Sequence, residues 1–213
     1  MRKLTIMIAA VLGLSSAASA ASIDAISFTA ARYRNDDPAA HVLGFNFTTG
    51  NVPVTVSALG YINDGFNGTH TIVLYDVVTR VAVAGASATV TTVGGGSSST
   101  SFTYAALPSL VQLVANRQYQ IVSENFDNEY YFTNATGVTV ASGVTFDVAV
   151  YQDFRTLPAT PGFATNPVAS NGVADFGPNF QLLIADVPEP GSLLLMAAGL
   201  ALGAAAARRT SKR

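Results

Sequence analysis

Apolar residues recur at every second position along several short stretches of the chain. Val52, Val54 and Val56 alternate with Pro53 and Thr55 in one of these stretches. A period of two places alternate side chains on opposite faces of a strand, so each stretch can turn one face toward a core. The pattern predicts strands near residues 26–32, 41–48, 52–61, 70–76, 81–92, 101–105, 118–124, 129–133, 137–141, 144–152 and 176–184.

Turn-forming sequences separate these strands, among them NDGFNG (63–68), GGGSSS (94–99) and FDNE (126–129). Between residues 21 and 186 only LPSLVQLVANRQY (107–119) suits a helical turn, and the same pattern also suits a loop entering a strand. Residues 155–174 hold three prolines and no alternation, so we expect a surface loop that crosses between sheets. Many short strands at close spacing predict an all-β fold, a β-sandwich or jelly roll.

The N-terminus has the three parts of a secretory signal peptide. Arg2 and Lys3 precede an apolar run from Leu4 to Leu14, and small residues then end in the pattern Ala18-Ser19-Ala20. An ordinary buried helix would show a polar face, which this run lacks. The sequence therefore predicts a signal peptide over residues 1–20, cleaved after Ala20.

The C-terminus carries a second apolar run, without charge from Ser192 to Ala207. A helix of these residues would cover roughly 24 Å of a bilayer core that is about 30 Å thick, so a span over 192–207 is feasible with snorkelling basic residues. A basic tail at 208–213 follows, with Arg208, Arg209, Lys212 and Arg213, and positive charge holds that end in the cytoplasm. The predicted β domain, residues 21–186, is then outside the membrane, tethered by one helix.

Charge is divided unevenly between the ends and the middle. All 13 acidic residues lie between Asp24 and Glu189, together with five arginines and no lysine, which gives this region a net charge of −8. Such a surface argues against nucleic acid and against anionic lipid as partners. The chain has no cysteine, so burial of a core, without disulfides, must stabilise the domain.

Two prolines flank a glutamate just before the apolar run, in the sequence Val187-Pro188-Glu189-Pro190. Proline favours an extended chain outside helix and sheet, which suits the cleft of a processing enzyme. These residues, the apolar run and the basic tail together resemble the PEP-CTERM sorting signal of Gram-negative bacteria. The resemblance implies a sorting signal over residues 187–213, recognition by an exosortase in the inner membrane, and removal of the tail. A membrane anchor without processing is the alternative.

Residues 40–125 resemble a β-sandwich module of unassigned function found in secreted bacterial proteins. Three stretches carry this resemblance: FNFTTGNVPVTVSALGYINDGFNGTHTIVLYD, SFTYAAL and NRQYQIVSEN. This resemblance implies a fold and no chemistry.

Few residues suit catalysis. His41 and His70 are the only histidines, and neither stands in a nucleophile or metal motif. Glu124 and Glu129 could in principle form a glycosidase pair, but acidic residues in a turn-like segment are ordinary turn formers. We therefore expect no enzymatic activity, with a secreted hydrolase as the least favoured alternative.

Oxygen-bearing residues gather in two predicted loops. Asn63, Asp64 and Asn67 lie in the first, and Glu124, Asp127 and Glu129 in the second. Calcium binds such oxygens, although neither loop matches the EF-hand spacing. We expect no cofactor; Asp64, Asn67, Asp127 and Glu129 are candidate ligands of a structural calcium ion, and plain Asx turns are the competing explanation of both loops.

The aromatic residues Tyr130, Tyr131 and Phe132 could stack on sugar rings, and Tyr104 and Tyr119 recur at strand positions. Core positions are the more frequent use of such residues in a sandwich. The sequence thus predicts an exported protein of the cell surface or extracellular matrix, with a structural or adhesive role in exopolysaccharide or biofilm. The alternative is a carbohydrate-binding module for an extracellular polysaccharide.

Overall fold

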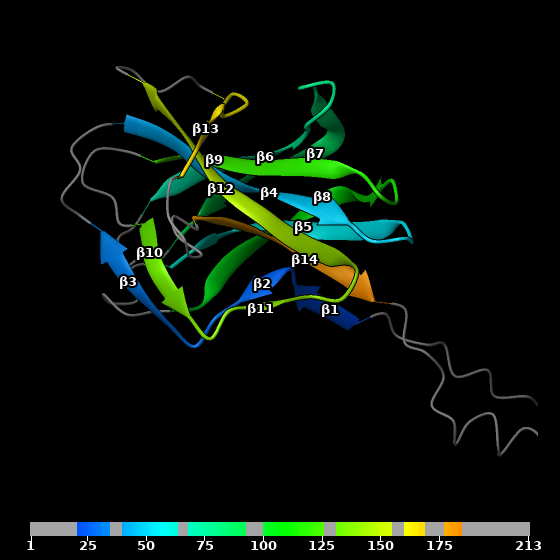
Figure 1. Ribbon diagram of the computed structural model, residues 1–213, viewed down its shortest axis with the longest axis horizontal. Helices are drawn as coiled ribbons and strands as arrows, with labels where there is room; N and C mark the ends of the chain where they lie inside the picture. The colour runs from blue at the N-terminus through cyan, green and yellow to red at the C-terminus, as the bar shows by residue number, and fades with distance from the viewer. Residues whose placement is uncertain are drawn as a thin grey trace, which may run out of the picture. The chain divides into compact units, whose positions relative to one another are not determined.

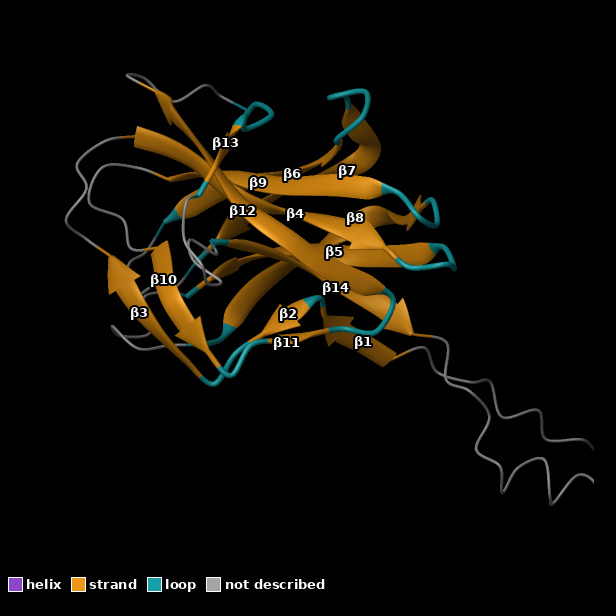
Figure 2. Ribbon diagram, in the orientation of Figure 1, coloured by secondary structure: helices purple, strands orange, loops and turns teal. Residues whose placement is uncertain are grey.

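The computed structural model describes residues 21–34, 40–63, 68–92, 100–125, 131–154, 160–168 and 177–184. All regular secondary structure in these ranges is β (Figure 2). Residues Ser22–Ile184 form a compact unit. The signal peptide, the C-terminal apolar run and the basic tail predicted from the sequence lie outside the described residues, and the predicted domain boundaries stay predictions.

One sheet has six strands in the order β13-β12-β4-β9-β6-β7 (Figure 1). Each neighbouring pair in it is antiparallel. In chain order its strands are β4 (Ala40–Thr49), β6 (Thr69–Asp76), β7 (Ala82–Thr91), β9 (Gln118–Asn125), β12 (Val144–Phe154) and β13 (Asn166–Pro167).

The other sheet has four strands in the order β1-β14-β5-β8, namely β1 (Ala21–Asp24), β14 (Pro178–Ile184), β5 (Val54–Ile62) and β8 (Phe102–Leu113). Two short antiparallel ribbons complete the unit. They pair β2 (Ile26–Ser27) with β11 (Thr139–Val140) and β3 (Ala30–Arg34) with β10 (Tyr131–Thr136).

The two sheets face each other across one hydrophobic core. In β4, Phe45 and Phe47 point into this core and are 1% exposed, whereas the alternating residues Asn46 and Thr48 are only partly buried. Across the core, the rings of Phe47 and Phe180 lie 4.6 Å apart between centroids. The alternation seen in the sequence therefore makes the inner face of a β-sandwich, as predicted.

Strand β5 keeps its apolar face inward through a β-bulge. Its pairing with β14 shifts register between Val56 and Ala58, which face the consecutive residues Leu182 and Gln181, so Ser57 is the extra residue. Val54 and Val56 before the bulge and Leu59 and Tyr61 after it all join the same core cluster. Without the bulge, a strict period of two would have turned Leu59 and Tyr61 away from the core.

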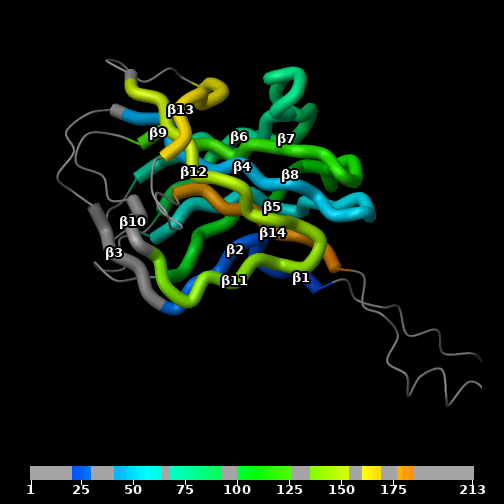
Figure 3. The backbone as a smooth tube through the Cα atoms, in the orientation of Figure 1, coloured from blue at the N-terminus to red at the C-terminus, as the bar shows by residue number. Residues whose placement is uncertain are grey.

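The two ends of the sandwich differ in what they carry (Figure 3). At one end, which we call the exit end, lie the turns at residues 50–53, 77–81 and 114–117 and the last residue of β14, Ile184. Pairing of Leu183 with Thr55 places Ile184 beside the start of β5. At the opposite end, the far end, β4 and β6 begin and β7 and β9 end.

Three expectations about single elements are corrected. The strand predicted at 101–105 continues as β8 to Leu113, so Leu110 and Leu113 lie in a strand and not in a helical turn. The strand predicted at 26–32 is divided into β2 and β3, with a break between Ser27 and Ala30. Val52, read as the first residue of a strand, lies in the turn before β5 and is 56% exposed.

Candidate functional site

The predicted sorting signal follows the last strand of the sandwich closely along the chain. Strand β14 ends at Ile184, three residues before Val187, and it is hydrogen-bonded between β1 and β5. The sheet thus fixes the point from which the chain leads into the signal. The predicted motif residues Val187, Pro188, Glu189 and Pro190, the basic residues Arg208, Arg209, Lys212 and Arg213, and the cleavage-site residues Ala18 and Ala20 all lie outside the described residues.

The calcium candidates Asp64, Asn67, Asp127 and Glu129 also lie outside the described residues. Their described neighbours are engaged within the protein: the Thr103 hydroxyl donates to Asn63 Oδ1 at 2.6 Å, and the Thr71 amide donates to Glu124 Oε1 at 2.5 Å. Within the described ranges, no three histidine or acidic side chains group as metal ligands. Calcium therefore stays a prediction.

The two histidines occupy separate places near the far end. His41 Nδ1 lies 2.7 Å from Asp153 Oδ1, and the Asp153 side chain is 64% exposed. His70 is fully buried, and its ring stacks on Tyr61 with centroids 3.6 Å apart. His70 Nδ1 lies 3.4 Å from the Glu124 carbonyl oxygen. Because a carbonyl oxygen can only accept a hydrogen bond, this contact assigns the ring proton of His70 to Nδ1. Burial lowers the pKa of His70 to about 4, so this histidine is neutral at neutral pH.

The aromatic residues proposed to bind sugar have different environments. Tyr119 is buried in the core, and its hydroxyl accepts a hydrogen bond from the Val114 amide at 2.9 Å. The Tyr104 hydroxyl accepts one from Asn179, and burial raises its pKa. Tyr131 and Phe132 lie in β10, where the structure describes the backbone, and Tyr130 lies outside the described residues. The expectation that strand aromatics fill the core is confirmed for Tyr119.

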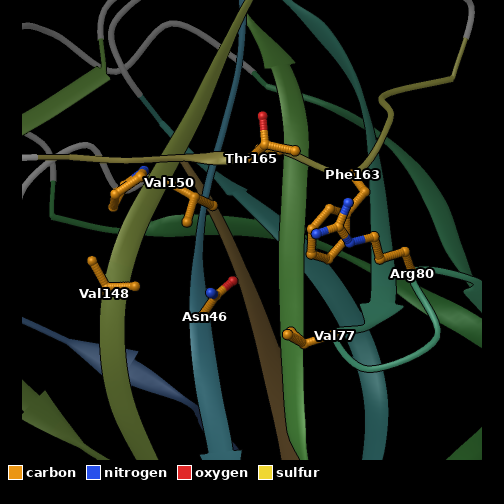
Figure 4. Close-up of a pocket in the computed structure, with 9 residues that line it drawn as sticks. Asn46, Val77, Arg80, Val148, Val150, Phe163 and Thr165 are labelled. Atoms are coloured by element: carbon orange, nitrogen blue, oxygen red, sulfur yellow. The ribbon is translucent and has the colours of Figure 1, made fainter.

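A pocket that the sequence did not reveal lies on the outer face of the six-stranded sheet (Figure 4). It has a volume of about 300 Å³ and is lined by Val148 and Val150 of β12, Asn46 of β4, and Phe163. The Arg80 guanidinium lies over the Phe163 ring, 5.4 Å from its centre. The pocket therefore combines an aliphatic wall, an aromatic face, an amide and a cation.

Residues 160–168 form the outer wall of this pocket and are held to the sheet by buried polar groups. The Gln120 side chain is fully buried and bonds both the amide and the carbonyl of Ala164, at 2.8 and 3.0 Å. The Tyr75 hydroxyl donates to the Pro161 carbonyl at 2.7 Å. These bonds give a segment without regular alternation a fixed position on the sheet.

The turn that presents Arg80 has an unusual backbone. Arg80 has a φ of 56°, a left-handed conformation that costs a residue with a side chain about 1 kcal/mol. Asp76 holds the turn, since its carboxylate accepts from the Thr79 amide at 2.9 Å and from the Arg117 side chain. Arg117 accordingly lowers the pKa of Asp76 to about 2. Sequence reasoning missed Arg80 and Phe163 because they are far apart in the chain. The absence of alternation in residues 155–174 predicted a surface loop, and that loop was the one available indication of this pocket.

Comparison with known proteins adds one finding about the C-terminus. Residues 186–209 match the PEP-CTERM protein-sorting motif. No curated protein matches the chain. In the part that the structure describes, no helix has the length and apolar character needed to cross a membrane. The chain therefore carries a PEP-CTERM protein-sorting motif at residues 186–209, which marks it as an exported protein with a membrane-associated sorting step.

Proposed function

We propose that this chain is a non-enzymatic surface protein that an exosortase sorts and releases from its C-terminal anchor. Its destination is the cell surface or extracellular matrix of a Gram-negative bacterium. There it has a structural or adhesive role in exopolysaccharide or biofilm and needs no cofactor, with the oxygen ligands of the two loops as candidates for a structural calcium ion. The match of residues 186–209 to the sorting motif carries the proposal.

The fold supports this role in two ways. A sandwich with a large hydrophobic core and no cysteine folds without disulfide chemistry, so its folding after export needs no oxidant. The last strand also ends three residues before Val187, which leaves the folded unit complete when the tail is removed.

Replacement of Pro188, Glu189 and Pro190 by alanine is expected to abolish removal of the tail in the native host. The physical reason is that alanine would let the segment join the helix predicted over residues 192–207, whereas proline favours an extended chain that suits the processing enzyme. Mass spectrometry of the protein from membrane and extracellular fractions measures the outcome. Thr210→Ala together with Ser211→Ala is the matched control, because both residues lie beyond the matched motif. If the triple variant has the same size and location as the unaltered protein, the sorting proposal is wrong, and the tail is a membrane anchor without processing.

A second candidate function, binding of a carbohydrate, is favoured by the pocket in Figure 4. Val148, Val150 and the Phe163 ring beside Arg80 offer apolar surface to the C–H groups of a sugar ring, and Arg80 offers donors to hydroxyl or carboxylate oxygens. We expect Phe163→Ala and Arg80→Ala each to weaken retention in gels that contain the host's exopolysaccharide by roughly fivefold, about 1 kcal/mol. Leu110→Ala, at an exposed site on β8, should leave retention unchanged. Equal mobility of the unaltered protein with and without the polysaccharide would refute this candidate.

A further inference from the structure

The exit end of the sandwich gathers three turns into one surface. Thr49 N donates to the Arg117 carbonyl at 3.0 Å and Asn116 N donates to the Gly50 carbonyl at 2.8 Å, which joins the turns 50–53 and 114–117. Val77 N donates to the Gln118 carbonyl at 3.2 Å and joins the turn 77–81 to them. These turns therefore have fixed positions relative to one another and to Ile184, where β14 leaves the sheet.

Valine side chains project from these turns into solvent. Five large apolar side chains are strongly exposed in the described ranges, and four of them lie on these turns: Val52 at 56%, Val78 at 78%, Val81 at 62% and Val114 at 57%. Valine favours strands and is uncommon in turns, where small and polar residues are usual. Single exposed apolar residues need no explanation, but a cluster at one end of a domain marks an interaction surface.

The charge of this end also differs from that of the domain as a whole. The residues of the three turns include Arg80 and Arg117 and no carboxylate, although the stretch of chain from Asp24 to Glu189 has a net charge of −8. Asp76, at the base of one turn, bonds to Arg117 and Thr79. Among the described residues, Asp147 also lies near this end, and it accepts hydrogen bonds from Thr48 at 2.7 Å and from Gln118 at 2.9 Å. The acidic character that argued against lipid contact is thus not a property of the turn tips.

The length of chain after β14 indicates what lies opposite these valines. The apolar run begins at Ser192, so residues 185–191 separate it from Ile184. Seven residues span at most about 24 Å even when fully extended. While the tail is in the bilayer, the exit end must stay within that distance of the lipid surface. The far end lies one strand length further along the sheet, roughly 30 Å for a strand such as β4.

We propose that the exit end docks on the outer surface of the cytoplasmic membrane, with Val52, Val78, Val81 and Val114 in contact with lipid until the tail is removed. This inference rests on the proposed sorting through a membrane-embedded tail. Docking presents the segment after Ile184 to a membrane enzyme in one orientation, with the sandwich upright above it. The partner is the lipid surface itself, which valine side chains enter at the level of the headgroups and the first acyl carbons.

The test uses the absence of cysteine from the chain, because a single introduced cysteine can be labelled uniquely. Asn51→Cys places an environment-sensitive fluorophore among the turn tips and leaves all four valines intact. Thr91→Cys, at the exposed end of β7, is the matched control at the far end. The chain without its signal peptide but with its tail is reconstituted in vesicles of phosphatidylethanolamine and phosphatidylglycerol.

Docking predicts that acrylamide in the water quenches the Asn51 probe several-fold less than the Thr91 probe, and that a lipid-borne quencher shows the opposite order. Replacement of all four valines by serine should restore access to the Asn51 probe. This variant should keep the urea midpoint of the parent, because the four side chains are exposed.

Other outcomes refute the inference in distinguishable ways. If the chain does not float with the vesicles, both the anchor and the docking are wrong. If it floats and both probes are equally accessible to acrylamide, the docking is wrong and the sorting proposal stands. If protection of the Asn51 probe disappears when the protein is diluted with lipid, a second copy covers the valines and lipid contact is refuted.

Discussion

Replacement of Gly44 by alanine is expected to destabilise the sandwich by about 3–5 kcal/mol, one of the largest effects available to a single methyl group. Gly44 lies in β4, paired with Val122 of β9 on one side and with Val150 of β12 on the other. A Cβ atom at Gly44 would lie 1.8 Å from the Ile121 carbonyl oxygen. Because that oxygen belongs to the backbone, the two central strands must separate to admit it.

Urea unfolding of the purified chain measures this effect as a loss of free energy at unchanged slope. Gly162→Ala is the matched control, since a Cβ there meets no atom within 4 Å. It should leave stability unchanged or raise it slightly by restricting the unfolded chain. If Gly44→Ala and Gly162→Ala unfold at the same urea concentration, the close approach of β4 and β9 is wrong.

The strands themselves could be predicted from the sequence because burial on one face leaves a period of two. The stretch predicted at 41–48 is β4, and the one predicted at 70–76 is β6, each within a residue or two. Phe45 and Phe47, which both lie in the core, show this period of two in the sequence. Alternation reports only which face of a strand is buried, so it specifies a sandwich but not the partners of each strand.

Pairing between strands distant in sequence could not be predicted in this way. Strand β14 inserts between β1 and β5, and no local pattern in PNFQLLI encodes that position. Bulges are also hidden, since Ser57, the extra residue of β5 opposite β14, interrupts the period that identifies β5. In β8, exposed residues around Pro108 break the alternation at a sheet edge, which is why the predicted strand ended at 105.

The candidate sites were unequally accessible to sequence reasoning. A linear signal such as residues 186–209 is recognised by composition and order, because an enzyme reads it as an extended peptide. The pocket at Phe163 and Arg80 depends on the side chain of Gln120. Its hydrogen bonds to Ala164 hold the loop against a strand that lies 44 residues earlier in the chain. The valines at the exit end were visible in the sequence, but Val52 and Val81 were assigned to predicted strands, and only the structure shows that the turns come together.

The second large effect expected is a loss of stability on mild acidification, caused by His70. The unfolded chain binds a proton at the usual histidine pKa of 6.5, whereas burial lowers the pKa in the folded protein to about 4. Between these values the unfolded state holds more protons, so the free energy of unfolding falls as the pH drops from 6.5 toward 4. The full difference corresponds to about 3 kcal/mol.

His70→Phe isolates this contribution, since phenylalanine keeps a ring against Tyr61 and cannot bind a proton. Burial raises the pKa of Glu124, whose effect has the opposite sign, and Asp76 loses its stabilising charge only below its usual pKa of 3.8. Both contributions are common to the two proteins, so the quantity to compare is the difference between their urea stabilities at each pH. Stability of the native chain relative to His70→Phe should fall by about 2–3 kcal/mol between pH 7 and pH 4. A difference independent of pH over that range would show that His70 is not buried in its neutral form.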